Sequence, residues 1–317
     1  ASDNEIAFAV TIDIRNTDTQ VNESIYIAGE TYSSSNLDGQ TYSDNGDAFL
    51  AKYNTSGDKQ WTRLLGSNKE DTAYALTTGS DGSIYIAGYT EGNLDEQTNS
   101  GVNTYDAFLA KYNTDGVNQW TRLLGTTSTD KAYALTTGSD GSIYIAGQVS
   151  GSFDGQTNGG YYDAFLAKYD TDGVNQWTQL LGTSKLDIAY SLTTGSDGSI
   201  YIVGETKGNL DGQTNGGDED AFLAKYNSDG VKQWTRLLGT SSNDQALALT
   251  TGTKNVSGNE IESIYIAGYT EGDLDGQTHG DRNNLGFYNA FLTKYDTDGI
   301  RKWTQLLMNV DDNKDNE

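Results

Sequence analysis

The chain has 317 residues and a mass of 34.2 kDa, and its 45 acidic and 20 basic residues give a formal net charge of −25. This balance argues against nucleic acid and anionic membrane surfaces as partners, because both need patches of Lys and Arg. The absence of cysteine excludes a disulfide framework and a thiolate metal site, and no apolar run approaches the ~18 residues of a membrane span.

One stretch of sequence recurs five times, at about 60 residues per copy. The motif SIYIAG, or its variant SIYIVG, begins at Ser24, Ser83, Ser142, Ser199 and Ser263. All five tryptophans occupy one repeat position: Trp61, Trp120, Trp177, Trp234 and Trp303. A repeat of this length is typical of proteins built from small β-sheets.

Four strands are expected in each repeat. In the second repeat the runs 73–78, 83–90, 106–113 and 118–125 have strand length and are rich in aromatic and β-branched residues. The connections 79–83 and 113–118 contain Asp-Gly, which supplies the positive φ of a tight hairpin. The connections 91–105 and 125–131 are longer and polar. The first repeat begins with its first strand at 6–13, and the fifth ends with its fourth at 302–307.

The sequence therefore predicts an all-β fold, a five-bladed β-propeller with four antiparallel strands per blade. Each blade is complete within one repeat, so closure of the ring depends on side-chain packing between the first and last blades. An open solenoid of five repeats is the alternative. We expect a single domain, 1–317, with blades at 5–66, 67–125, 126–182, 183–239 and 240–308 and an acidic tail at 309–317.

The repeated text resembles that of a known family. The pattern G-S-I-Y-I-A-G-x-T, then D-A-F-L-A-K-Y-x-x-D-G-x-x-x-W, then L-L-G and D-x-A-x-A-L, resembles the bacterial SBBP-type β-propeller repeat as far as about Leu307. The resemblance implies a propeller fold and a bacterial protein that is secreted or surface-exposed, and it implies no common reaction. The loop after the second strand lacks the proline usual in the family, so its conformation does not carry over.

Two series of carboxylates are candidates for holding a metal. The first precedes the first strand of each repeat and would surround one mouth of a central channel: Glu5, Asp71, Asp130, Asp187 and Asp244. The second opens the third strand: Asp47, Asp106, Asp163 and Asp220, with Asn289 in the fifth repeat. Hard cations such as Ca²⁺ take oxygen ligands of this kind, so Ca²⁺ is the expected cofactor if one is bound. Alternatively, these side chains cap loops by accepting backbone N–H bonds.

The long loop after the second strand is the candidate ligand-binding segment, since loops on a rigid scaffold often carry function. Its polar contacts would come from one Asp and one Gln per repeat: Asp38, Gln40, Asp95, Gln97, Asp154, Gln156, Asp211, Gln213, Asp275 and Gln277. Asn99 is a further polar contact in the second repeat. The Tyr and Trp series could stack on sugar rings, or it could simply pack the sheets.

A few segments break the symmetry. The first hairpins of repeats one and five are extended, at 14–23 and 253–262, and could contact a protein partner. The loop 278–288 holds His279, the only histidine, beside Asp281 and Arg282. No G-x-S-x-G motif accompanies this histidine, so a serine hydrolase triad is not indicated.

We therefore expect a secreted or cell-surface binding module without catalytic activity. Its ligand would be carbohydrate or another neutral polar surface, and five equal weak sites would gain avidity on a multivalent target. The small polar start ASDNE, typical of a processed N-terminus, agrees with secretion. The alternatives are a structural or assembly protein that contacts other proteins, and a glycosidase or lyase.

Overall fold

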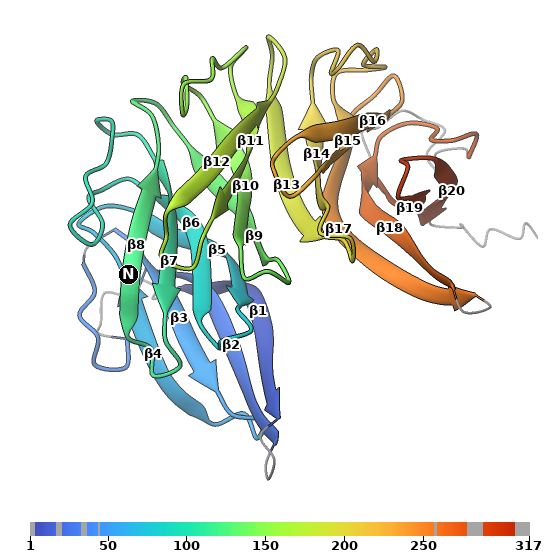
Figure 1. The fold of residues 1–317 in the computed structure, drawn as a ribbon. Coiled ribbons are helices and arrows are strands. Elements are labelled where there is room, and N and C mark those ends of the chain that lie inside the picture. Colours follow the sequence, from blue (N-terminus) through green and yellow to red (C-terminus); the bar gives the residue numbers. More distant parts are fainter. Residues whose placement is uncertain are drawn as a thin grey trace, which may run out of the picture. The chain divides into compact units, whose positions relative to one another are not determined.

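The computed structural model describes residues 4–16, 21–32, 37–43, 45–256, 259–277 and 288–307. Within them all helix or strand structure is β, arranged as five sheets of four antiparallel strands (Figure 1). In every sheet the strands lie side by side in chain order. The predicted five sheets, one per repeat, are confirmed, and the closed ring stays a prediction.

The strands of the first three sheets are β1 (Glu5–Asn16), β2 (Val21–Thr31), β3 (Asp47–Tyr53), β4 (Lys59–Leu65), β5 (Asp71–Thr78), β6 (Ile84–Thr90), β7 (Asp106–Tyr112), β8 (Asn118–Leu124), β9 (Lys131–Thr137), β10 (Ile143–Val149), β11 (Asp163–Tyr169) and β12 (Asn175–Leu181). The strands of the last two sheets are β13 (Asp187–Thr194), β14 (Ile200–Thr206), β15 (Asp220–Tyr226), β16 (Lys232–Leu238), β17 (Asp244–Val256), β18 (Asn259–Thr270), β19 (Asn289–Asp296) and β20 (Arg301–Leu307).

The chain divides into two compact units, Ala1–Leu181 with sheets 1 to 3 and Gly182–Glu317 with sheets 4 and 5, where the sheets are numbered in chain order. The boundary falls in the connection between two repeats, so each sheet lies wholly within one unit. The predicted acidic tail 309–317 lies outside the described residues.

The hairpins have the turn chemistry that the sequence predicts. Between β5 and β6 the Gly79 amide donates to Ser83 O, and Gly82 adopts a φ of 79°. Asp81 Oδ1 accepts the Ser83 N–H at 2.9 Å, which fixes the turn from inside. The chain uses Asp-Gly here because a residue with a Cβ is strained at this φ.

A bulge in the first strand lets two strands approach closely. The register of β5 against β6 shifts between Ala73 and Ala75, and a Cβ on Gly88 would lie 1.8 Å from the Thr72 carbonyl oxygen. Only glycine is compatible with that backbone contact. The first strands of all five sheets carry an equivalent bulge, which turns residue 74 or its counterpart out of the regular alternation.

Each sheet has two apolar faces. All seven residues of β6 are buried, as are those of β10 and β14. In the N-terminal unit one apolar cluster joins Leu50 and Leu65 of sheet 1 to Ile84 and Phe108 of sheet 2. Equivalent clusters join sheet 2 to sheet 3 and, in the C-terminal unit, sheet 4 to sheet 5. Side-by-side packing of the sheets therefore forms the core.

The repeated tryptophan fastens one sheet to the next. Trp120 of β8 lies against the sheet 3 hairpin, where a Cβ on Gly173 would come within 2.9 Å of the indole, and its Nε1 donates to Thr171 O. Beside it Arg122 Nε donates to Gly173 O at 2.9 Å. Sheets 1 and 2, and sheets 4 and 5, share this tryptophan–glycine and arginine–carbonyl arrangement. In these sheet pairs the tryptophan side chain therefore packs between neighbouring sheets.

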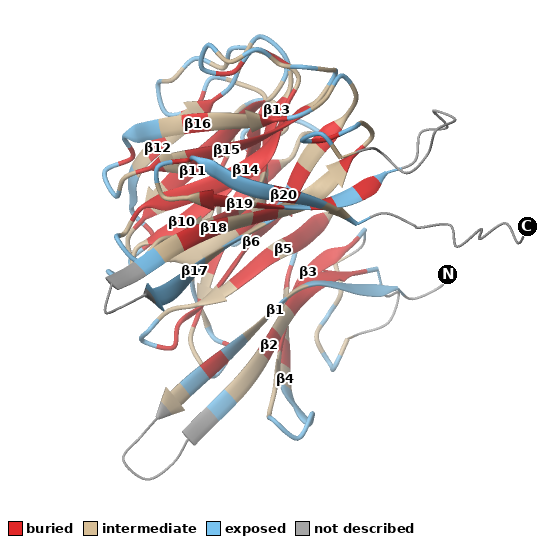
Figure 2. Cartoon of the chain, turned by 90° about the vertical axis from the view of Figure 1, so that its right-hand side faces the viewer, coloured by how far each residue is buried: buried red, intermediate tan, exposed pale blue. Residues whose placement is uncertain are grey.

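Two sheet faces at the ends of the repeat array are uncovered. Alternate residues of β1 expose apolar side chains: Ile6, Phe8, Val10, Ile12 and Ile14. In sheet 5 Leu307 is 77% exposed, whereas its counterpart Leu124 in sheet 2 is 3% exposed. Figure 2 shows the exposed residues along β20.

The predicted hairpin extensions are strands. β1 pairs with β2 as far as Asn16 and Val21, and β17 pairs with β18 as far as Val256 and Asn259. The predicted contact of these extensions with a protein partner stays a prediction.

The tryptophan packing leads to a test by substitution. Trp120→Ala should lower the free energy of unfolding by about 3 kcal/mol or more, because it removes the indole from Gly173 and one hydrogen bond. Trp303→Ala in the last sheet, where the residue is 37% exposed, should cost about 1 kcal/mol. Urea unfolding followed by circular dichroism measures both, and equal losses would contradict the packing role.

Candidate functional site

The aspartates at the start of the first strands are buried and hold the loops between repeats. Asp130 Oδ2 accepts the backbone N–H of Thr126 at 2.5 Å and its hydroxyl at 2.9 Å, and Oδ1 accepts the Ser150 N–H at 3.0 Å. The same pair of bonds comes from the residue four positions earlier to Asp71, Asp187 and Asp244. Glu5, at the corresponding position of β1, is exposed.

Burial changes the acidity of this series. It raises the pKa of Asp71 and of Asp130 to about 6, although hydrogen bonds from the loops oppose the change. Burial also raises the pKa of Asp187 and of Asp244. These carboxyl groups are therefore held within the protein and titrate above the usual range of aspartate.

The aspartates that open the third strands hold the long loops. Asp106 Oδ2 accepts the Ser100 N–H at 2.8 Å, and a Cβ on Gly125 would come within 2.2 Å of the Asp106 carboxyl. Asp47, Asp163 and Asp220 accept equivalent bonds from their own long loops. Asn289 occupies the position in β19. Burial raises the pKa of Asp106 and of Asp220.

The two series meet between neighbouring sheets. The Asp130 N–H donates to Tyr105 O at 2.6 Å, so the aspartate of sheet 3 lies next to Asp106 of sheet 2. In the part of the chain that the structure describes, no three His, Cys, Asp or Glu side chains converge as metal ligands would. The hydrogen bonds place these aspartates as loop caps, and Ca²⁺ binding stays a prediction.

The predicted ligand-binding aspartates shape a two-residue turn in the long loop. They adopt positive φ angles between 47° and 56°, at Asp38, Asp95, Asp154, Asp211 and Asp275. Their carboxylates reach the outermost strand of the same sheet. For example, Asp95 Oδ2 accepts bonds from Asn118 Nδ2 and Thr121 Oγ1 at 2.6 Å each. Asp38, Asp211 and Asp275 form ion pairs there with Lys59, Lys232 and Arg301.

The predicted glutamines fall into two groups. In sheets 3 to 5 the side-chain amide bonds the outermost strand: Gln213 Nε2 donates to Thr235 O at 2.8 Å and Oε1 accepts the Leu237 N–H, and Gln156 and Gln277 do the same. Among the described residues, Gln40 and Gln97 form no such bond. Asn99, also a predicted contact, is buried and donates to Thr90 O, so it holds the loop.

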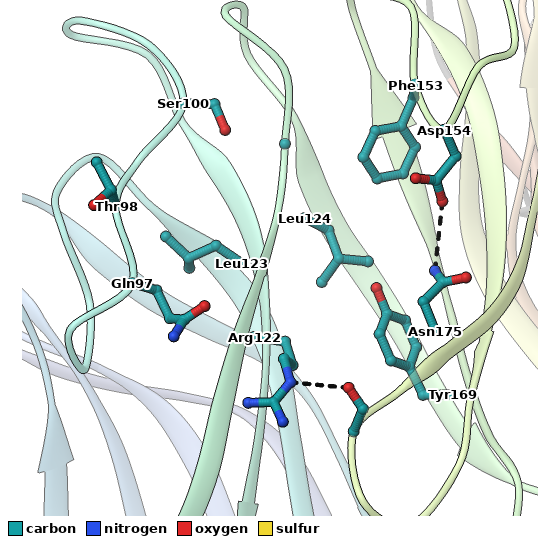
Figure 3. A pocket seen from close by; sticks show the side chains of 12 residues that line it. Gln97, Thr98, Ser100, Arg122, Leu123, Leu124, Phe153, Asp154, Tyr169 and Asn175 are labelled. Carbon is teal, nitrogen blue, oxygen red and sulfur yellow. Dashed lines mark hydrogen bonds between the residues drawn. The ribbon is translucent and has the colours of Figure 1, made fainter.

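Gln97 instead lines a groove between sheets 2 and 3, with a volume of about 400 Å³ (Figure 3). Thr98 and Ser100 of the long loop border the groove on one side. Phe153, Asp154, Tyr169 and Asn175 of sheet 3 border it on the other, and Arg122 and Leu123 of β8 form its floor. The groove combines the Gln97 amide, the Arg122 guanidinium and hydroxyls with the half-buried Leu123 side chain, whereas Phe153 and Tyr169 are buried behind it. This mixture suits a polar ligand with some apolar surface.

Sequence reasoning found Gln97 and Asp154 and missed Arg122, Tyr169 and Asn175. Arg122 lies within β8, and Tyr169 and Asn175 lie at the ends of β11 and β12 that flank a hairpin. All three are far from the long loop in sequence, and the packing of sheet 3 against β8 brings them together. His279, Asp281 and Arg282, the predicted unlike constellation, lie outside the described residues.

The second-to-last residue of the second strand and its side-chain partners differ between sheets 2 and 4. In sheet 2 Glu70 accepts the Tyr89 hydroxyl at 2.6 Å, and the Lys131 ammonium lies 3.9 Å from the centre of the Tyr89 ring. In sheet 4 Glu205 replaces Tyr89 and accepts the Tyr190 hydroxyl at 2.8 Å. Burial, aided by the neighbouring carboxylate of Glu219, raises the pKa of Glu205 to about 7.

Comparison with protein families supports the resemblance drawn from the repeats. A model described as the SBBP β-propeller repeat matches residues 60–95 and 176–211. Each match begins in the last strand of one sheet and ends in the long loop of the next. These two segments therefore match the SBBP-type β-propeller repeat.

Two curated proteins are similar to part of the chain. The regulatory protein FlaEY of Caulobacter vibrioides is 28% identical over 208 residues, which are 60% of this chain and 22% of that protein. An uncharacterized WD repeat-containing protein, L264, of Acanthamoeba polyphaga mimivirus is 22% identical over 58% of this chain and 17% of its own. The chain thus spans about a fifth of the length of these relatives.

Two solved structures show a distant likeness. A rhamnogalacturonan lyase of Bacillus licheniformis has 13% identity and a TM-score of 0.28, over 93% of this chain and 52% of its own. The exotype rhamnogalacturonan lyase YesX has 13% identity and a TM-score of 0.26, over 93% and 50%. Likeness at this level carries no argument about activity. In the described residues, no helix is long and apolar enough to cross a membrane.

The buried aspartates predict a specific dependence of stability on pH. The pKa of Asp130 is about 6 in the folded protein, against 3.8 for an unperturbed aspartate, so the folded state binds more protons between these values. The contribution of Asp130 to stability is therefore largest below pH 4 and is lost as the pH rises through 6, by on the order of 3 kcal/mol.

Asp130→Asn should remove this loss. The free energy of unfolding of the variant, relative to the unsubstituted protein, should rise between pH 4 and pH 7, as measured by urea unfolding at several pH values. Parallel pH profiles for the two proteins would show that Asp130 does not titrate in this range.

Proposed function

We propose that the chain is a secreted or cell-surface binding module that binds carbohydrate without transforming it. The groove between sheets 2 and 3 supports this proposal most directly. It presents the side-chain amide of Gln97, which forms no hydrogen bond to the described part of the protein, beside the Arg122 guanidinium and the half-buried Leu123 side chain. Sugars combine hydroxyl groups with apolar ring faces, and both kinds of contact are offered here.

The loop caps give this surface a fixed shape. Asp106 binds the loop that carries Gln97, and Asp130 binds the neighbouring connection after β8, so this surface is held before a ligand arrives. A preorganised loop binds with less loss of conformational entropy. Gln40, which also forms no bond to the described residues of its outermost strand, would offer a second site of this kind, and two weak sites on one molecule favour multivalent glycans. Ca²⁺ bound by the acidic loops would stiffen them further.

We further propose that the five sheets close into a ring. In the contact between sheets 1 and 2, Leu65 of sheet 1 packs in one apolar cluster with Leu76 of sheet 2. The exposed Leu307 of sheet 5 is the counterpart of Leu65, and the exposed Val10 of β1 is the counterpart of Leu76. Each uncovered face is therefore complementary in kind to the other. No strand needs to be exchanged, because every sheet is complete within one repeat.

An assembly protein is the second candidate. The same uncovered apolar faces favour it, because a further repeat or another protein could cover them instead. The two functions differ in their ligands, since an assembly protein would bind protein and show no signal with glycans.

The groove can be tested by one truncation. Gln97→Ala should weaken binding of a glycan, first identified on a glycan array, by about three- to tenfold, since it deletes the amide contacts and leaves the loop caps in place. Gln119→Ala, on the exposed side of β8, is the matched control and should bind as the unsubstituted protein does. Isothermal titration calorimetry measures both. Absence of any glycan signal, or equal loss in both variants, would overturn the proposal.

Ring closure can be tested by comparing Leu307 in the last sheet with its counterpart Leu124 in an interior sheet. If the faces of sheets 1 and 5 cover one another, Leu307→Ala should cost about 2–5 kcal/mol of unfolding free energy, the same cost that is expected for Leu124→Ala in an interior sheet. A cost for Leu307→Ala below about 0.5 kcal/mol would show that the face is open. A cost that grows with protein concentration would show that a second copy covers it.

A further inference from the structure

Two repeat positions on the long-loop side of the sheets form an ion pair in sheet 2. Lys69 lies two residues before the buried Asp71, and Glu91 directly follows β6. The Lys69 ammonium and the Glu91 carboxylate are 3.3 Å apart. A carboxylate of the protein itself therefore occupies the space beside this lysine.

Sheet 4 carries two lysines at the same positions. Lys185 lies two residues before Asp187, and Lys207 directly follows β14. Sheet 3 places Ser128 and Ser150 there, and sheet 5 places Ser242 and Glu271. In a chain of net charge −25, Lys207 thus stands where sheet 2 has Glu91, and a pair of lysines replaces the ion pair at these two positions.

The two lysines line one pocket of about 430 Å³. Its walls also include Thr183, Ser184, Asn209, Asn215 and the backbone of Gly208 and Gly217, and none of its lining side chains is apolar or acidic. Figure 1 shows the segments that carry it at the long-loop end of sheet 4, around β13 and β14. A pocket of this size holds a small polar molecule.

The pocket offers mainly hydrogen-bond donors. Asn209 Oδ1 accepts the Asn215 N–H at 3.0 Å, so the Nδ2 group of Asn209 is left to donate. Lys207 donates to Glu219 at 2.8 Å and lies 3.6 Å from Asp218, which holds its charge at the edge of the pocket. Lys185 is exposed and forms no ion pair with any described residue. Lys185 is therefore the stronger anchor for an incoming anion, with Lys207 assisting.

We propose that this pocket binds the carboxylate of an acidic sugar. In sheet 2 the Glu91 side chain supplies a carboxylate to Lys69. In sheet 4 Glu219 pairs with Lys207, and the ligand supplies the carboxylate to Lys185. The Ser184 hydroxyl and the Asn209 amide then face the sugar hydroxyls, which a bare inorganic anion would leave unused. The inference rests on the proposed carbohydrate binding and adds a single charge-selective site to it.

Two methyl glycosides provide the test, because methyl glucuronide and methyl glucoside differ only in a carboxylate in place of a hydroxymethyl group. Calorimetry at low salt should show the glucuronide binding about tenfold more tightly, with the difference shrinking at high salt. Sodium phosphate, titrated separately and as a competitor, reports whether any anion suffices.

Four variants localise the site. Lys185→Ser, which restores the residue of sheets 3 and 5, should remove the preference for the glucuronide, and Lys207→Glu, which recreates the ion pair of sheet 2, should do the same. Lys69→Ser is the matched control and should leave glucuronide affinity unchanged. Glu91→Lys should create a second glucuronide site in sheet 2 and raise the stoichiometry from one to two.

Equal affinity for the two glycosides would overturn the inference, as would equal loss in Lys185→Ser and Lys69→Ser. Phosphate that displaces the glucuronide at the same concentration would show a general anion site and refute the sugar assignment. These results are independent of the groove in sheets 2 and 3. Glycan binding that is lost in Gln97→Ala and retained in Lys185→Ser would keep the proposed function while rejecting this site.

Discussion

A strand that is buried along its whole length must be covered on both faces of its sheet, and this requirement determines how the sheets pack. β6, β10 and β14 are such strands, so their sheets need a neighbour on each side. The apolar clusters between sheets meet most of that need. Trp120 and Arg122 then fix how neighbouring sheets are oriented, because both bind the backbone of the next hairpin. Apolar side chains of β1 and Leu307 of β20 remain exposed.

The buried aspartates hold the loops between strands in a fixed conformation, which a binding surface requires. Asp106 and Asp130 accept backbone N–H groups that the long, irregular loops would otherwise leave unpaired. Holding a carboxyl group in that environment costs free energy, which the raised pKa of Asp130 records. The protein is therefore more stable when Asp130 is protonated. The outer side chains of the loops that these aspartates hold remain available for contact with a ligand.

Much of the fold follows from the sequence, because turns and strands have local causes. The Asp-Gly pairs and the alternation of apolar residues locate the hairpins, and the observed bounds of β5 to β8 differ from the expected runs by at most two residues. The roles of the acidic series could not be read in the same way. A loop cap and a metal ligand both require a carboxylate oxygen, and only the donors around Asp71 or Asp106 distinguish them.

The candidate site was partly visible in the sequence. Gln97 and Gln213 stand in nearly identical text, yet Gln213 bonds β16 and Gln97 borders a groove, a difference set by the surrounding packing. Arg122 reaches Gly173 from another repeat, a contact that no local pattern predicts. Lys185 and Lys207 were within reach of sequence reasoning, since a comparison of all five copies position by position exposes the reversal of charge.

Every sheet consists of one continuous piece of chain, with its strands adjacent in the order in which they are synthesised. Duplication or deletion of one repeat in the gene would therefore add or remove a whole sheet and leave the internal hydrogen bonds of the others intact. Proteins of this architecture can change size in steps of one repeat during evolution. A newly copied sheet would begin as an identical duplicate and could then acquire its own ligand by a change as small as Glu to Lys.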